Sequence, residues 1–311
     1  MRVSVIIPTY NYGEFIGDAL RSVEAQTLTD WECIVIDDAS SDDTAAIVRT
    51  FVDRDARFRY LRMEQNGGVS KARNRGFAEA RGTFIQMVDA DDVIGPRKLE
   101  IQVAWMEQHP EVAVVYSDYM PFQDRPIVEG LGAYRIDEEI SGSGDPIMAR
   151  LLRSNIFRLN TVLFRVKILG DVGGFREGFR YVEDWDFWLR IAARGYRFHY
   201  LDAPEAMSGV RSNPRSLSTD KRSMHAHYLP VLQHLWAHGG LSFSNRVSLV
   251  LRYTVFLLDR IMLGRGKVII LEDRKAAFLC IIFIASLIVL PFWPFYKLRH
   301  LIFADWTGTA G

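Results

Sequence analysis

Three carboxylates directly follow an apolar stretch of the chain. Residues 83–88 are mostly apolar or β-prone, and Asp89, Asp91 and Asp92 come within the next four positions. Clustered carboxylates repel one another unless a cation or hydrogen-bond donors neutralise them. Mg²⁺ commonly binds one or two protein carboxylates together with phosphate oxygens. The spacing therefore favours an enzyme that handles a nucleotide diphosphate, although a solvated acidic turn has the same composition.

Polar residues follow three other stretches that have the composition of buried strands. Thr9 to Asn11 follow the first, Asp37 and Asp38 end the second, and Asn66 to Gly68 come after the third. Because ligands bind beyond the carboxyl ends of parallel strands, these residues should converge on one edge with nucleotide-binding chemistry. We expect strands at 3–8, 31–37, 58–63, 83–88 and 112–116, and helices at 14–26, 41–52, 69–81 and 96–109.

This alternation of strands and helices predicts an α/β fold, with a mostly parallel, Rossmann-like sheet and helices on both faces. Beyond residue 120 the pattern is looser. We expect a loop at 130–144, helices at 146–154 and 184–194, and strands at 158–165, 196–201 and 205–210. Gly195 is placed to close the second of these helices as its C-cap residue.

Charge and cysteine content exclude several classes of protein. Lys and Arg total 38, as do Asp and Glu, so the net charge is zero and nucleic acid is not expected as the main partner. Cys33 and Cys280 lie in apolar runs without Cys or His neighbours, which predicts neither a disulfide framework nor a zinc site. The first residues are too short an apolar run for a secretory signal and have the pattern of a first strand.

An uncharged run at residues 276–296 indicates membrane association. As a helix it would be roughly 31 Å long, close to the hydrocarbon thickness of a bilayer. Lys275 and Lys297 bracket it, and Pro291 and Pro294 leave a single span, a membrane-lying segment and a buried core helix as alternatives. More Lys and Arg residues precede the run than follow it, so the preceding part should face the cytoplasm.

Five segments, in this order, resemble glycosyltransferase family 2. They are VSVIIPTYN (3–11), VIDDASSDDT (35–44), NGGVSKARNRG (66–76), VDADD (88–92) and VEDWDFWLR (182–190). The resemblance covers roughly residues 1–215 and implies the GT-A fold of inverting enzymes that use nucleotide sugars. On this basis residues 1–220 form the catalytic domain, with a nucleotide-sugar-binding half (1–118) and an acceptor-binding half (119–220). A helical, membrane-associated region (221–311) follows.

The resemblance implies a donor site built from strand ends. Asp38 would accept a hydrogen bond from the N3–H of uracil, while Asp37 would be structural. Pro8, Thr9 and Tyr10 would line the base pocket. The segment with Asn66 and Gly67 would pass under the nucleotide, Arg73 would lie near the base or the phosphates, and Arg211 would contact the diphosphate.

The resemblance also implies the metal ligands and the general base. Asp91 would coordinate Mn²⁺ or Mg²⁺, and Asp89 would bind the ribose hydroxyls or a metal-bound water. Asp184 would take the proton of the acceptor, with Glu183 as the alternative base, although Asp184 could also simply cap the helix that it opens. Many relatives carry a His where Asn213 stands, so the third metal ligand is open.

The resemblance implies an inverting transfer of a sugar from a nucleotide diphosphate donor, a UDP-sugar by analogy. The acceptor would be a hydroxyl of a glycan or lipid-linked molecule in cell-envelope polysaccharide or glycolipid synthesis, at the cytoplasmic face of a membrane. One alternative is transfer to a polyprenyl phosphate, which needs no general base. The other is a non-catalytic nucleotide-binding scaffold, which only Asn213 favours.

Overall fold

The computed structural model describes residues 1–123, 140–179 and 181–213, and separate positions at 227–228, 230–232, 234–236, 241–242, 245 and 249. The chain divides into two compact units, Met1–Leu241 and Ser242–Gly311. All the named helices and strands belong to the first unit.

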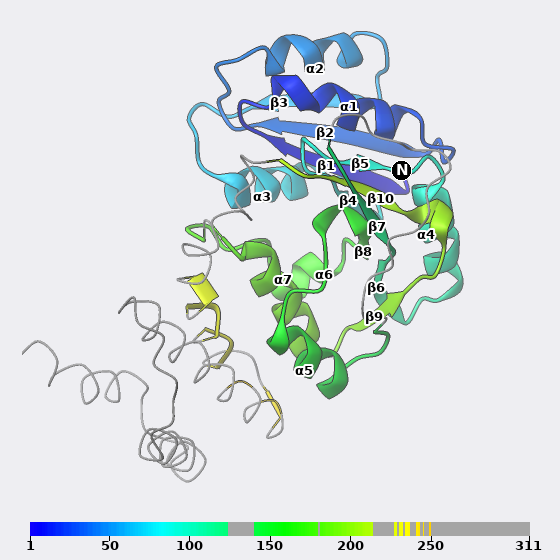
Figure 1. Ribbon diagram of the computed structural model, residues 1–311, viewed down its shortest axis with the longest axis vertical. Helices are drawn as coiled ribbons and strands as arrows, with labels where there is room; N and C mark the ends of the chain where they lie inside the picture. Colours follow the sequence, from blue (N-terminus) through cyan, green and yellow to red (C-terminus); the bar gives the residue numbers. More distant parts are fainter. Residues whose placement is uncertain are drawn as a thin grey trace, which may run out of the picture. The chain divides into compact units, whose positions relative to one another are not determined.

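A seven-stranded sheet forms the centre of this unit (Figure 1). In spatial order its strands are β3 (Phe58–Arg62), β2 (Trp31–Asp37), β1 (Val3–Thr9), β4 (Phe84–Met87), β8 (Val162–Arg165), β6 (Val112–Tyr116) and β9 (Arg197–Tyr200). Only β8 runs antiparallel to its neighbours. The expected mostly parallel α/β sheet is therefore confirmed.

A second, three-stranded sheet has the order β5-β10-β7. Its strands are β5 (Val93–Ile94), β10 (Ser208–Arg211) and β7 (Tyr119–Phe122). Because β5 directly follows the acidic segment, pairing with β10 brings residues near 211 back to that segment. This sheet was not expected, since strands of two, four and four residues leave little periodic signal.

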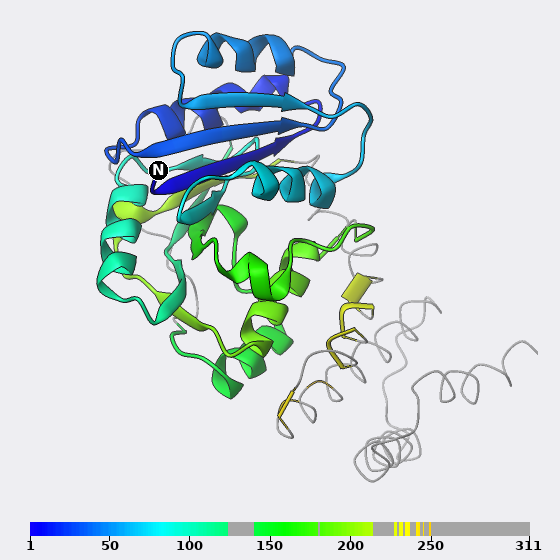
Figure 2. The ribbon, with the colours of Figure 1, turned by 180° about the vertical axis from the view of Figure 1, so that it is seen from behind.

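Helices cover both faces of the large sheet (Figures 1 and 2). One face packs against α1 (Gly13–Glu24), α2 (Thr44–Val52) and α4 (Lys98–Gln108). The other carries α3 (Val69–Glu79), α5 (Asp145–Arg153), α6 (Ile168–Val172) and α7 (Glu183–Ala193). On this second face the ring of Phe77 in α3 contacts Phe164 of β8 and Phe187 of α7, with centroids 6.0 and 6.1 Å away.

Strand β1 shows how the sequence supplies both faces. Val3, Val5 and Ile7 are fully buried and join the core under α1, α2 and α4. Ile6 points to the opposite face, where a Cβ added to Gly76 of α3 would lie 2.4 Å from its Cγ2 atom. Glycine at position 76 therefore lets α3 approach β1 closely.

The expected elements of the first half are confirmed, with ends that shift by one to three residues. In the second half, the expected strands at 158–165 and 205–210 each begin with a 3-10 turn, η1 (Leu159–Thr161) and η2 (Pro204–Ala206). Helix α6 was not expected, because it has only five residues.

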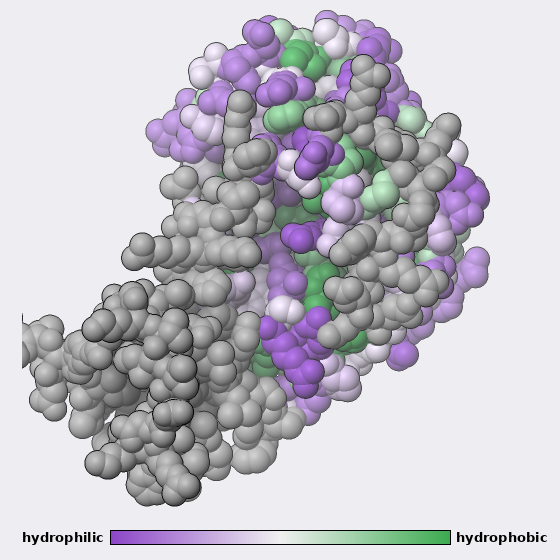
Figure 3. Space-filling view, in the orientation of Figure 1, coloured by the Kyte–Doolittle hydropathy of each residue, from purple (hydrophilic) through white to green (hydrophobic). Residues whose placement is uncertain are grey.

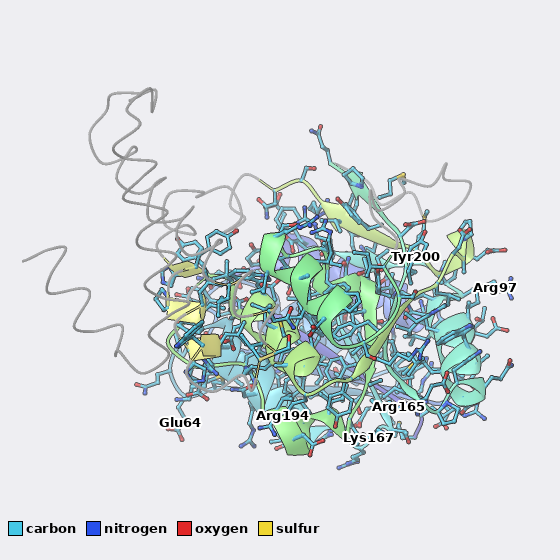
Figure 4. All side chains as sticks on the ribbon, turned by 90° about the horizontal axis from the view of Figure 1, so that it is seen from below. Glu64, Arg97, Arg165, Lys167, Arg194 and Tyr200 are labelled. Atoms are coloured by element: carbon cyan, nitrogen blue, oxygen red, sulfur yellow. The ribbon has the colours of Figure 1, made fainter. Side chains whose placement is uncertain are left out.

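The face of the described part that is seen in Figure 3 is mainly polar. Hydrophilic residues dominate its rim in the space-filling view, with smaller hydrophobic areas between them (Figure 3). Arg97, Lys167 and Arg194 are exposed and project from the outside of the fold (Figure 4). Among the described residues no helix is both long and apolar enough to cross a bilayer. The run at 276–296, which carries the membrane prediction, lies outside the described residues.

Candidate active site

The carboxyl ends of β1, β2 and β4 meet at one edge of the sheet, as predicted. Thr9 pairs with Asp37 at the ends of β1 and β2. The Asp38 N–H donates to the Thr9 carbonyl (2.9 Å), and the Val88 N–H donates to the Ile6 carbonyl (3.1 Å). The segments that follow these strands hold the predicted donor residues.

Asp38 is buried at this edge and binds the glycine turn before α3. Its two carboxylate oxygens accept the backbone N–H groups of Gly67 (2.7 Å) and Gly68 (2.8 Å). The side chain of Asn66 donates to its carbonyl (3.2 Å). Gly68 has φ of +86°, a conformation that glycine adopts without strain. The carboxylate keeps further lone pairs, so the contact with a base stays a prediction.

The predicted base pocket combines buried and exposed side chains. Pro8 and Thr9 are buried, whereas Tyr10 is 47% exposed. The Thr9 hydroxyl is buried and has no hydrogen-bond partner among the described residues. Buried hydroxyls are normally paired, so this one is suited to a bound ligand.

Asp37 and Asp42 have structural roles. Asp37 accepts hydrogen bonds from the Ser40 N–H (2.7 Å) and the Tyr60 hydroxyl. Asp42 accepts the N–H groups of Thr44 (3.0 Å) and Gly13 (2.9 Å), at the starts of α2 and α1. These two carboxylates thus stabilise the loops around Asp38 rather than facing a ligand.

Arg73 connects the two groups of predicted catalytic acids. Its Nη2 donates to Asp89 (2.8 Å), the first acid after β4, and its Nη1 donates to Glu183 (2.6 Å), the first residue of α7. The Arg73 residue is 3% exposed, and its guanidinium lies 5.1 Å from the ring centre of Phe175. Both terminal nitrogens thus bind protein carboxylates, and a contact of Arg73 with the base or phosphates stays a prediction.

Asp184 lies beside Glu183 in the first turn of α7. One of its oxygens accepts the Asn155 side-chain amide (2.6 Å) and the other its neighbour's N–H, that of Trp185 (2.7 Å). Burial raises the pKa of Asp184, against the opposing effects of the Arg73 charge and these hydrogen bonds. A carboxylate with a raised pKa is a better proton acceptor than an ordinary aspartate.

Glu183 is less suited to take up a proton from an acceptor. Burial raises its pKa to about 7, while the charge of Arg73 lowers it. The Glu183 residue is 8% exposed, and its carboxylate is already bound to that guanidinium. Val182, the residue before it, has φ of +55°, which is costly for a β-branched side chain. The start of α7 is therefore held in a strained turn, as is common at functional sites.

Asp91 and Asp92 differ in their surroundings. Burial and then the charge of Asp89 raise the pKa of Asp91 to about 6. Its Oδ2 accepts the side-chain amide of Asn213 (3.2 Å). Asp92 is buried and accepts the Arg211 N–H (2.9 Å). Asn213 is thus beside the second acid, where the sequence placed the missing His.

The guanidinium of Arg211 binds three other groups of the protein. Its guanidinium donates to the Asp91 carbonyl (3.0 Å), the Gln123 carbonyl (2.9 Å) and the Asp18 carboxylate (2.7 Å). Its side chain is 4% exposed. Arg211 therefore anchors the acidic segment to α1, and its predicted contact with the diphosphate stays a prediction.

The two carboxylates Asp89 and Asp91 fit a divalent ion that also binds a diphosphate. Among the described residues there is no group of three or more His, Cys, Asp or Glu that could hold a metal by itself. Mg²⁺ and similar ions are commonly bound by one or two carboxylates and completed by phosphate oxygens. Burial raises the pKa of Asp91 most, and the charge of Asp89 raises it further; such a cation would remove the repulsion between the two acids.

Two residues of the site were missed in the sequence. Asn155 holds Asp184, and Asp18 holds Arg211 across 193 positions of the chain. Neither lies in a recognisable motif. Their only signal is polarity next to an apolar segment, which many surface residues share.

Comparisons with known proteins bear on the family and the fold of this chain. Residues 4–158 match the family model of Glycosyl transferase family 2, and residues 84–296 match that of Glycosyl transferase family group 2. EpsE of Bacillus subtilis is 30% identical over 68% of this chain and 73% of its own length. The O-antigen biosynthesis protein RfbC of Myxococcus xanthus is 33% identical over 65% of this chain.

The match to RfbC covers only 15% of that protein, and a curated relative from Sinorhizobium fredii is matched over 23% of its length. The solved structure of S. aureus TarS with UDP-GlcNAc superposes with a TM-score of 0.66 at 22% identity, over 93% of this chain and 81% of that one. This likeness confirms the expected GT-A-like α/β fold. The family models and the match to EpsE establish that the chain belongs to glycosyltransferase family 2.

Proposed function

We propose that the chain is an inverting glycosyltransferase that moves a sugar from a nucleotide diphosphate donor, a UDP-sugar, to an acceptor hydroxyl. The observation that carries this proposal is the Arg73 guanidinium, which holds Asp89 of the donor side and Glu183 of the acceptor side on its two nitrogens. Asp184, next to Glu183, would thereby lie near the acids that hold the cation on the diphosphate.

In the proposed reaction the acceptor oxygen attacks the anomeric carbon as the bond to the diphosphate breaks. Asp184 takes the hydroxyl proton, and Asn155 and the Trp185 N–H orient its carboxylate. A divalent cation, Mn²⁺ or Mg²⁺, held by Asp89 and Asp91, would neutralise the charge on the departing diphosphate. Asp38 and Thr9 would hold the base at the ends of β2 and β1.

The proposed acceptor is a glycan or lipid-linked molecule of a cell-envelope polysaccharide. The O-antigen function in the name of RfbC and the UDP-GlcNAc in the TarS crystal support the polysaccharide and the uracil donor. The charge pattern around residues 276–296 supports an anchored enzyme at the cytoplasmic face of a membrane.

A donor panel tests the first half of this proposal. UDP-, GDP- and dTDP-sugars, each with Mn²⁺, are compared for the rise in Tm that they cause in the full chain. A ligand at 100 times its Kd stabilises the folded state by about 2.7 kcal/mol, so one nucleotide class should stand out. A rise with GDP-sugars alone would replace the proposed donor, and no rise with any of them would contradict nucleotide-sugar binding.

Substituting Asp184 tests the second half. Asp184→Asn should lower kcat for transfer to a hydroxyl acceptor by about 10²- to 10⁴-fold, since the base is lost. The Tm rise caused by the donor should be retained. Asp53→Asn, at the exposed end of α2, is the matched control and should leave both quantities unchanged. Full transfer by D184N with a polyprenyl phosphate acceptor would favour the alternative, because a phosphate needs no base.

A further inference from the structure

Helix α3 contacts both halves of the candidate site. At its start, the N–H groups of Gly67 and Gly68 bind Asp38. In its middle, Arg73 bridges Asp89 and Glu183. Helix α3 therefore connects the turn predicted to pass under the nucleotide with Arg73. Arg73 in turn binds the first residue of α7, the helix that carries the proposed base.

The Arg73 guanidinium forms ion pairs with two carboxylates, Asp89 and Glu183, and we call this arrangement the Arg73 bridge. The guanidinium is buried, and its Nε has no hydrogen-bond partner among the described residues. Its two carboxylate partners come from elements more than 90 residues apart, at the end of β4 and the start of α7. The position of the guanidinium therefore depends on both carboxylates. If either is lost, the buried positive charge is left with a single ion pair.

Contacts other than Arg73 also hold α3 against the segment that precedes α7. The Asn74 side chain donates to the Phe175 carbonyl (2.8 Å) and accepts the Phe175 N–H (2.8 Å). The Phe77 ring stacks on Phe175, with centroids 5.5 Å apart. Removing the guanidinium should therefore leave the two segments packed, which makes substitution of Arg73 informative about coupling rather than folding.

We propose that Arg73 is a positioning residue that couples the donor side of the site, at Asp89, to the start of α7, where the base Asp184 lies. A ligand that binds or restrains Asp89 thereby restrains the first turn of α7 through the shared guanidinium. The inference rests on the proposed function for the identity of that ligand, but the bridge itself is a property of the free protein.

Hydrogen exchange in the free protein tests the bridge without any nucleotide. Asp89→Asn should speed exchange of the amides at residues 185–188 by about tenfold in the wild-type background, a typical size for directly coupled groups. The same substitution should have no further effect in an Arg73→Gln background. Equal effects of Asp89→Asn in both backgrounds, or none in either, would overturn the proposal.

Two variants separate bridging from charge and from general damage. Arg73→Lys keeps the charge but lacks the forked donors that reach both carboxylates, so it should lose the coupling as Arg73→Gln does. Arg75→Gln changes an exposed arginine of the same helix, which pairs with Glu79, and should preserve the coupling. Coupling that survives in Arg73→Lys would overturn the bridging role.

Addition of UDP and Mn²⁺ extends the test to the proposed function. In the wild type this probe should change exchange at residues 185–188 by at least about threefold, and in Arg73→Gln it should still bind without that change. The same change in both proteins, or none in the wild type despite a UDP-induced rise in Tm, would overturn the proposal. If UDP fails to bind while Asp89→Asn still shows coupling through Arg73, the donor assignment fails and the bridge stands.

Discussion

Asp184 is held by two donors that act on its two oxygens. The Asn155 amide and the Trp185 N–H both favour the ionised form, and burial opposes them and raises the pKa above that of an ordinary aspartate. Under the proposed function, the rate of transfer should fall as the pH drops through this raised pKa, because the protonated carboxyl cannot accept a proton.

Asn155→Ala should move this acidic limb to higher pH. The lost hydrogen bond stabilised the carboxylate, so its removal raises the pKa further, by about one unit if the bond contributes about 1.5 kcal/mol. The measurement is the pH dependence of kcat/KM for the variant and for Ser154→Ala, whose side chain instead accepts from Arg150. An unchanged limb in Asn155→Ala would show that Asp184 is not the group that titrates.

Lys98 offers a second test at the scale of one residue. It is fully buried, and its Nζ donates to the Thr161 carbonyl (2.8 Å), the Ser117 hydroxyl (3.2 Å) and the Ala206 carbonyl (3.4 Å). Since none of these acceptors is charged, burial lowers its pKa well below the usual value.

A lowered lysine pKa makes the unfolded chain bind more protons than the folded one between that pKa and about 10.4. In this window stability rises with pH. The unfolding free energy of the wild type minus that of Lys98→Met should therefore increase with pH, by up to about 1.4 kcal/mol per pH unit toward pH 10. Denaturant unfolding measures the difference. Lys167→Met changes an exposed lysine, and its unfolding free energy should have the same pH dependence as that of the wild type.

At the scale of elements, helix α3 depends on one close approach. Gly76→Ala would place a Cβ 2.4 Å from Ile6, a fully buried residue of the central strand, so α3 or β1 must shift. Overpacking of this kind costs about 1–3 kcal/mol. Because the turn of Gly67 and Gly68 that binds Asp38 leads into α3, the variant should also weaken donor binding. Gly170→Ala in α6 meets no atom within 4 Å and should change neither the Tm nor the binding.

Elements were predictable where they are long and strictly periodic. Strands β1, β2 and β6 are uniformly buried, and their mostly apolar composition marks them in the sequence. The β5-β10-β7 sheet was not predictable, because its register joins residues 93 and 209, and no local pattern encodes such a pairing. The sequence also could not show that β8 runs antiparallel between β4 and β6.

Among the site residues, the motifs placed Asp38, Asp89, Asp91 and Asp184 at the right strand and helix ends. Their partners were beyond the sequence. The Arg73 bridge joins positions 110 residues apart, and the Arg211–Asp18 pair joins positions 193 apart. A side chain of Arg has the same local signal whether it faces a phosphate or a buried carboxylate, so only the packing of α3 and β10 decides.

At the scale of the whole molecule, the division at Leu241 suggests a direct test of the membrane proposal. The helices and strands named above, which come from the described residues, lie in the unit Met1–Leu241, and the apolar run 276–296 belongs to the other unit. A chain ending at residue 241 should bind UDP with the same Tm rise as the full chain. It should remain in the supernatant after membranes are sedimented, whereas the full chain should be recovered with them. Recovery of both in the supernatant would contradict the proposed anchor.

Strand β10 also sets the order in which the site can be completed during synthesis. Asp92 lies at the acidic segment, and the backbone N–H that it accepts belongs to Arg211, 119 residues later. At a translation rate of about 5–20 residues per second, roughly 6 to 24 s separate the two on the ribosome. Until then the nascent polypeptide carries its clustered aspartates without the contact from Arg211. Under the proposed function, a partly synthesised chain therefore lacks a complete site for the nucleotide sugar.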